Sequence, residues 1–126
     1  MPTPSVILVI GTRGRDSCSD LLERLASSGS EIGFVPDYQE ALEKADMDDV
    51  EAMIIDHDPD VPRIIDFCKN LRSEHHYMPV VALEDESTLV DRMLLLEAGA
   101  DVCLPRSIDA RELYTFTRAL MRRDGW

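Results

Sequence analysis

Five short apolar runs alternate along this chain with segments of helical periodicity, and this alternation narrows the possible folds more than any other feature. The runs cover residues 5–10, 31–35, 51–56, 80–83 and 102–104. The first run is rich in β-branched residues and stops at Gly11, which is typical of a strand that is buried on both faces. Strands that alternate with helices favour a parallel sheet covered by helices on both sides.

The segments between the runs carry helix start signals and apolar stripes. Asp37 with Glu40, and Asp109 with Glu112, have the spacing of helix N-termini, and Gly99 is a candidate C-cap. In the last helix the expected inner stripe consists of Leu113, Phe116, Thr117 and Leu120. Five helices are therefore predicted, over approximately residues 17–29, 37–45, 62–71, 87–99 and 109–120.

The composition indicates one globular domain that covers residues 1–126, and it leaves open whether an output domain follows Trp126. The formal net charge of −12 argues against nucleic acid as a partner of this domain, because binding a phosphate backbone requires clustered Lys and Arg. No apolar run approaches the ~20 residues of a membrane helix. The odd count of three cysteines predicts reduced core residues, and therefore a cytoplasmic protein.

The fourth predicted helix has more apolar residues than one buried face can hold. Successive helical residues rotate by about 100°, so the three leucines at positions 94–96 cannot all face the sheet. We expect Leu95 and Tyr114 to lie on an exposed apolar face that binds a protein partner or a second copy of the chain. A broad core face is the alternative interpretation.

Three further features give the chain a family resemblance. Asp56 ends the third run, an Ala-Gly-Ala-Asp turn at 98–101 precedes the fifth, and residues 108–113 open the last helix. Over essentially its whole length the chain resembles the receiver domain of two-component response regulators. The resemblance implies a flavodoxin-like (CheY-like) α/β fold: a doubly wound, five-stranded parallel sheet of strand order 2-1-3-4-5 with five helices. It also implies that the functional site lies at the carboxyl ends of the strands.

The resemblance also assigns roles to individual positions, and here the chain departs from the family. Asp56 occupies the position of the phosphate-accepting aspartate. Gly11 and Thr12 replace the acidic pair that holds Mg²⁺ with it. Glu84 falls at the position of the phosphate-binding Thr or Ser, and Arg106 at the position of the Lys. Two smaller departures are Cys103 at the aromatic switch position and Ser107 in place of a Pro.

These departures predict a domain that is not an enzyme and needs no cofactor, with weak or absent Mg²⁺ binding. Mg²⁺ requires near-octahedral oxygen coordination, and a neutral Thr12 does not replace two carboxylates. Without a metal, attack by Asp56 on a phosphodonor brings like charges together, and Glu84 would crowd the phosphoryl oxygens further. We expect Arg106 to form a fixed pair with Asp56 or Glu84 that locks the pocket in one state.

Several alternatives stay open from the sequence. Asp56 could still be phosphorylated by a histidine kinase, or Asp58 could be the acceptor. Asp56, Asp58 and Glu84 could bind a metal ion together. The loop at 11–17 has the glycine, hydroxyl and cationic content of a nucleotide or flavin site, although it matches no standard spacing. The histidines at 75 and 76 have no Cys or His at ligand spacing, which favours a surface loop over a zinc site.

Overall fold

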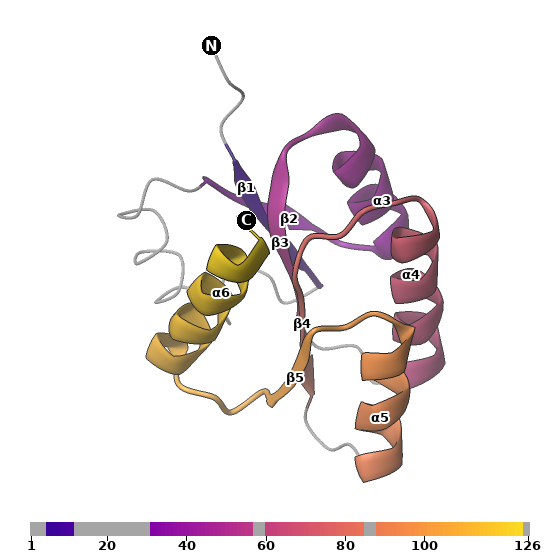
Figure 1. The fold of residues 1–126 in the computed structure, drawn as a ribbon, viewed down its shortest axis with the longest axis vertical. Helices are drawn as coiled ribbons and strands as arrows, with labels where there is room; N and C mark the ends of the chain where they lie inside the picture. The colour runs from indigo at the N-terminus through magenta and orange to yellow at the C-terminus, as the bar shows by residue number, and fades with distance from the viewer. Residues whose placement is uncertain (1–4, 12–30, 57–59, 85–87, 125–126) are drawn as a thin grey trace.

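A computed structural model describes residues 5–11, 31–56, 60–84 and 88–124, and it shows the predicted parallel sheet (Figure 1). Every neighbouring pair of strands is parallel, and the order is β2-β1-β3-β4-β5. The strand order expected from the family resemblance is therefore confirmed. The strands are β1 (Val6–Ile10), β2 (Glu31–Val35), β3 (Val50–Asp56), β4 (Val80–Glu84) and β5 (Val102–Pro105).

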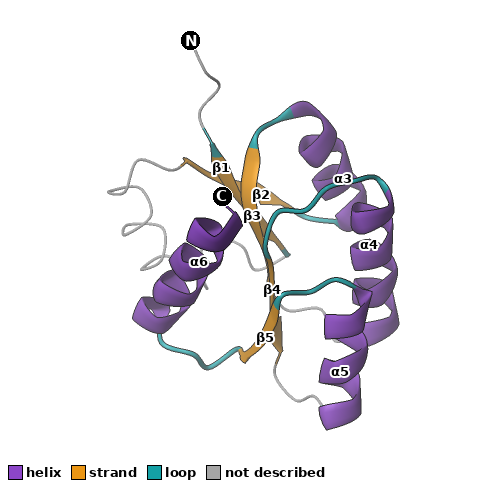
Figure 2. Cartoon of the chain, viewed as in Figure 1, coloured by secondary structure: helices purple, strands orange, loops and turns teal. Residues whose placement is uncertain are grey.

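Four helices are described rather than the five predicted, because the segment expected to form the first helix, at 17–29, lies outside the described residues. Figure 2 shows α6 on one side of the sheet and the other three helices on the opposite side. None of the described helices has the length and apolarity needed to cross a membrane. The helices are α3 (Tyr38–Met47), α4 (Val61–Ser73), α5 (Leu89–Ala98) and α6 (Ala110–Asp124).

The sheet separates two apolar clusters, because alternate side chains of each strand point to opposite faces. One cluster joins the strands to α3, α4 and α5, and it includes Met53, Ile55 and Phe67. The other lies under α6 and includes Ala52, Ile54 and Leu113. Burial on both faces explains why the central strands read as continuous apolar runs rather than as alternating ones.

Local capping sets the helix boundaries as the sequence predicts. The Asp37 carboxylate accepts a hydrogen bond from the Glu40 backbone N–H at 2.9 Å, and Thr88 and Asp91 form a reciprocal capping box. Gly99 follows α5 with a φ of +129°, and its N–H donates to the Leu96 carbonyl at 3.2 Å.

Candidate functional site

The carboxyl ends of four strands bring the predicted site residues to one edge of the sheet. Gly11 follows β1, Asp56 ends β3, Glu84 ends β4, and Arg106 follows β5. The register aligns these ends, with Ile10 opposite Ile55 and Glu84 opposite Pro105. Function at this edge is the expectation for an open parallel sheet, because helix-covered faces leave only the strand ends accessible.

Asp56 and Arg106 form an ion pair at this edge. The Nε atom of Arg106 donates to the Oδ1 atom of Asp56 at 3.3 Å, across 50 residues of sequence. The side chains of Asp56 and Arg106 are only 1% and 13% exposed, respectively. The sequence left Asp56 and Glu84 open as partners of Arg106, and the structure shows the contact with Asp56. The backbone N–H of Arg106 donates to the Glu84 carbonyl at 2.7 Å, which anchors the start of the loop after β5.

Gly11 packs directly against the backbone of Asp56. A Cβ atom at position 11 would come within 2.3 Å of the Asp56 carbonyl oxygen, a distance that real Cβ atoms essentially never show. The Gly11 N–H donates to the Val35 carbonyl at 3.0 Å, so β1 continues pairing with β2 up to this residue. In this backbone conformation, β1 and β3 therefore leave no room for a Cβ atom at position 11.

Glu84 is directed away from Asp56. Asp56 lies opposite Leu83 in the register, so strand alternation turns the next side chain, Glu84, to the other face of the sheet. Cys103 shares that face, since it pairs with Ala82. Burial raises the pKa of the Cys103 thiol to about 12, and the charge of Glu84 contributes to the rise. The expectation that Glu84 would crowd a phosphoryl group on Asp56 does not agree with this placement, because the two carboxylates lie on opposite faces of the sheet.

The expectation that Leu95 lies on an exposed apolar face is wrong, because the side chain of Leu95 is fully buried. Leu95 and Ala98 lie one turn apart on the inner side of α5, and Leu95 belongs to the cluster shared with α4. Tyr114 is half-buried against the cluster under α6, on the opposite face of the sheet. The two residues therefore do not share a surface.

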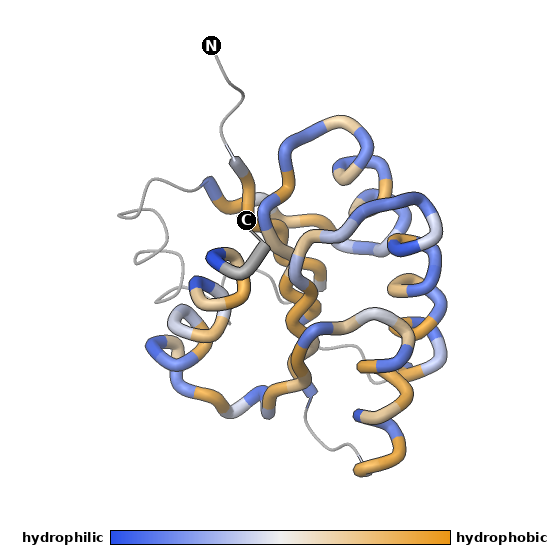
Figure 3. Tube along the Cα trace, in the orientation of Figure 1, coloured by the Kyte–Doolittle hydropathy of each residue, from blue (hydrophilic) through white to orange (hydrophobic). Residues whose placement is uncertain are grey.

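Other apolar residues of α5 are nevertheless exposed. Five residues of α5 have exposed fractions between 44% and 65%, and we call them the α5 apolar surface: Leu89, Val90, Met93, Leu94 and Leu96. They lie at helical spacing on the outer side, roughly opposite Leu95. Figure 3 shows that much of α5 has the hydrophobic colour. The prediction that the consecutive leucines cannot all be buried is confirmed.

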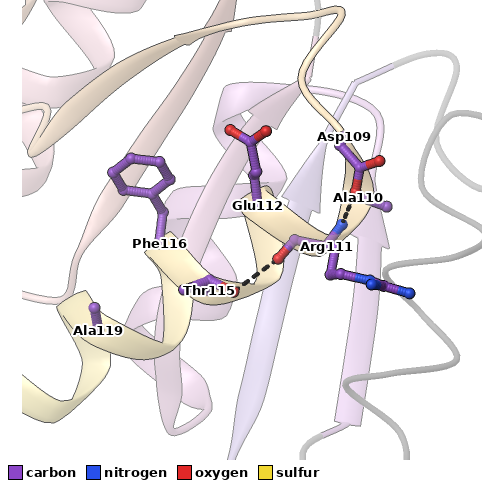
Figure 4. Close-up of a pocket in the computed structure, with 7 residues that line it drawn as sticks. All are labelled: Asp109, Ala110, Arg111, Glu112, Thr115, Phe116 and Ala119. Carbon is purple, nitrogen blue, oxygen red and sulfur yellow. Dashed lines mark hydrogen bonds between the residues drawn. The ribbon is translucent and has the colours of Figure 1, made fainter.

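A hollow on the outer face of α6 is a feature that the sequence did not indicate. It is lined by Asp109, Ala110, Arg111, Glu112, Thr115, Phe116 and Ala119 (Figure 4). Phe116 was expected in the inner stripe of this helix, but its side chain is 42% exposed. Leu113 and Thr117 form the inner stripe instead, and both are buried. The hollow lies on α6, apart from the contact between Asp56 and Arg106.

Part of the predicted site lies outside the described residues. This holds for Thr12, for the alternative acceptor Asp58, and for most of the loop at 11–17 that could cradle a phosphate. Asp58 also belonged to the alternative metal site with Asp56 and Glu84, and the two described members of that set face opposite sides of the sheet. The site that can be described therefore consists of Gly11, Asp56, Glu84 and Arg106.

Comparison with known proteins agrees with this architecture. The response regulator receiver domain family matches residues 14–118. The chain therefore belongs to the receiver domains of two-component response regulators, and the predicted family is confirmed.

The relatives in sequence are longer than this chain. The transcriptional regulatory protein CpxR of Escherichia coli K12 is 35% identical over 112 residues, which is 89% of this chain and 47% of CpxR. Response regulator MprA of Mycobacterium leprae is 32% identical over 105 residues, which is 82% of this chain and 45% of MprA. The chain thus spans about half the length of these relatives. A two-component response regulator from Clostridium difficile shares the fold, with a TM-score of 0.81 and 21% identity over 97% of this chain and 99% of that one.

Proposed function

We propose that this receiver domain works as a protein-interaction module whose output does not depend on phosphorylation. The observation that supports the proposal is the buried contact of 3.3 Å between Asp56 and Arg106. In this reading the domain catalyses no reaction of its own, binds no nucleic acid and acts in the cytoplasm.

The charges around Asp56 support this proposal. Phosphoryl transfer to a carboxylate needs positive charge at the transferred group, and in receivers a metal ion held by several carboxylates supplies it. Here Asp56 already has the Arg106 guanidinium as a counter-charge, and a carboxylate at position 11 would overlap the Asp56 carbonyl. A metal ion at this edge would therefore have few charged ligands and would compete with a fixed cation. Mg²⁺ binding should be weak or absent.

The α5 apolar surface supports the choice of a protein partner. The outer face of a helix in a soluble domain is ordinarily polar, whereas this one presents three leucines, a valine and a methionine. Exposed apolar groups of this kind mark contact sites, because covering them removes apolar area from water. We propose that the fourth and fifth helices of the family frame, here α5 and α6, and the strand between them bind a protein partner or a second copy of the chain.

The second candidate function is a receiver that is still phosphorylated on Asp56 by a histidine kinase, with weak or altered Mg²⁺ dependence. The observation that favours it is the position of Arg106. A guanidinium can bind two phosphoryl oxygens at once, so the group that now contacts Asp56 could also bind a phosphorylated Asp56. The two functions differ in whether the pair opens for a phosphoryl group.

An amide NMR titration separates these two functions. The wild-type chain is titrated with Mg²⁺ and then with beryllofluoride, a phosphoryl mimic, and Asp56→Ala serves as the control. The interaction-module proposal expects no saturable shifts near Asp56 and Arg106 at millimolar Mg²⁺ and after beryllofluoride. Saturable shifts that vanish in Asp56→Ala would reject it in favour of the phosphorylated receiver.

A second experiment tests the proposed output surface. Sedimentation velocity and pull-down are compared for the wild type and for Leu94→Glu, which places a charge on the α5 apolar surface. Met47→Glu is the matched control, since Met47 is 81% exposed and lies on α3. Loss of self-association or of partner binding in Leu94→Glu alone is expected. Equal behaviour of both variants and the wild type would exclude this surface.

A further inference from the structure

Three potential metal ligands converge at a place that is separate from the Asp56 edge. The carboxylates of Asp46 and Glu74 and the imidazole of His76 each offer a donor atom, and these atoms all lie within 4.8 Å of one another. Asp46 lies in the last turn of α3, Glu74 is the C-cap of α4, and His76 lies in the turn before β4. Because 28 residues separate Asp46 from Glu74 in sequence, only the packing of α3 beside α4 brings them together.

An aromatic contact joins the two helices. The rings of Tyr38 on α3 and Phe67 on α4 stack with centroids 4.7 Å apart, and Figure 1 shows these two helices on the same side of the sheet. Closer to their C-terminal ends, the Nε2 atom of His76 lies 2.7 Å from the Oδ1 atom of Asp46. Two donor atoms of a tetrahedral site are about 3.4 Å apart when each lies ~2.1 Å from the ion, so the His76 and Asp46 atoms need to separate by less than about 1 Å to admit a metal.

The turn that carries Glu74 and His76 is held by the backbone of α4 and by Arg72. The Nη1 atom of Arg72 donates to the carbonyls of His76 at 2.9 Å and Met78 at 2.8 Å. The His76 N–H donates to the Leu71 carbonyl at 3.1 Å, and His75 has a positive φ of 66°. A turn fixed in this way loses little conformational freedom when a ligand binds, which favours binding.

The local charge favours a cation. Asp46 and Glu74 are exposed carboxylates, and α3 and α4 both direct their negative C-terminal ends towards this place. Among the described residues, Lys44 of α3 pairs with Asp48 at 3.6 Å, and Arg72 of α4 pairs with Asp101 at 3.0 Å. The guanidinium of Arg72 opposes a metal ion, but its charge is shared with Asp101 and with three carbonyl groups.

We propose that Asp46, Glu74 and His76 bind a divalent transition-metal ion of the Zn²⁺ class. One imidazole nitrogen with two carboxylate oxygens suits Zn²⁺, whereas Mg²⁺ and Ca²⁺ prefer oxygen ligands alone. Three protein ligands leave a position for water or for a ligand from a partner protein. The ion takes the place of the direct contact between His76 and Asp46, and it joins the end of α3 to the turn that leads into β4. Binding to the folded state should stabilise the domain.

The site is tested by titrating the metal-free chain with Zn²⁺ and, separately, with Mg²⁺, followed by calorimetry and amide NMR. Saturable shifts at Asp46, Glu74 and His76 are expected with Zn²⁺ and not with Mg²⁺, together with a higher melting temperature. Asp46→Asn and His76→Gln should each weaken Zn²⁺ binding at least about 10-fold, since even changes behind a ligand cost 10- to 100-fold.

His75→Asn is the matched control, because it removes the neighbouring imidazole and Asn tolerates the positive φ at this position. It should bind Zn²⁺ with unchanged affinity. The proposal is overturned if Zn²⁺ causes no saturable shift, or if His76→Gln binds as tightly as the wild type. It is also overturned if the shifts appear at Cys68 or Cys103 instead. None of these outcomes depends on what happens at Asp56, so the site is tested independently of the proposed function.

Discussion

The contact between Asp56 and Arg106 can be tested through the free energy of unfolding. Replacing Arg106 with glutamine removes the guanidinium and leaves a carboxylate that is only 1% exposed. Breaking a buried pair from one side costs roughly 3–5 kcal/mol, because the remaining charge is poorly solvated. We expect Arg106→Gln to lower the free energy of unfolding by about 3 kcal/mol, the lower end of this range. Arg106 is 13% exposed, so water can reach the space that the guanidinium leaves and can partly solvate Asp56. For a domain of this size that loss lowers the melting temperature by on the order of 10 °C.

The assay is urea unfolding of a double-mutant cycle. Arg106→Gln, Asp56→Asn and the double variant are compared with the wild type, and Arg122→Gln on the exposed end of α6 is the control. Asp56→Asn in the Arg106→Gln background should recover part of the loss, with a coupling of at least about 1 kcal/mol. The control should stay within about 0.5 kcal/mol of the wild type. A loss below ~1 kcal/mol for Arg106→Gln, with no coupling, would refute the reasoning and with it the lock.

Three further predictions follow from single contacts. Gly11→Ala should destabilise the domain by at least ~1 kcal/mol, because its Cβ would lie 2.3 Å from a backbone oxygen at a positive φ. Gly33→Ala should cost less, because its Cβ would meet side-chain atoms at 3.1 Å and 3.3 Å rather than backbone. Equal unfolding midpoints of the two variants would contradict this. Arg72→Ala should lower the free energy of unfolding, measured in urea, by on the order of 3 kcal/mol, because it removes charged hydrogen bonds to four groups. A loss within ~0.5 kcal/mol would show that water replaces these bonds. Burial raises the pKa of Cys68 from 9.0 to about 11 and that of Cys103 from 9.0 to about 12, so unfolded thiols ionise first. The free energy of unfolding should therefore stay constant below pH 9 and fall between pH 9 and 12, as far as these two thiols are concerned. Replacing either cysteine with alanine should make this fall less steep in the reduced protein. An unchanged pH dependence would exclude the thiols as its source.

The fold was largely predictable from local patterns. Continuous apolar runs predict strands that are buried on both faces, and a capping residue such as Asp37 predicts a helix start. Both signals involve only a few neighbouring residues, so they can be recognised without knowledge of the tertiary structure. The position of Asp56 at the end of the third strand follows from the same patterns, whereas the gathering of the site residues at the strand ends was an expectation from the family resemblance.

The direction of individual side chains was not predictable in the same way. The composition of α5 predicts that some leucines are exposed, but the rotation of the helix on its neighbours decides that Leu95 is buried while Leu94 and Leu96 are exposed. Strand register likewise decides that Glu84 turns away from Asp56, because a shift of one residue reverses the face of every side chain.

The sequence by itself therefore determined the parallel sheet and the described helices, because these depend on short-range periodicity. The family resemblance, rather than periodicity, indicated that the site lies at the carboxyl ends of the strands. Only the tertiary structure decided which charges meet. Arg106 reaches Asp56 across 50 residues, and His76 reaches Asp46 across 30, because register and helix packing bring distant segments together. Contacts of this kind leave no pattern in neighbouring residues, so sequence reading interpreted the histidines as a surface loop and left two partners open for Arg106.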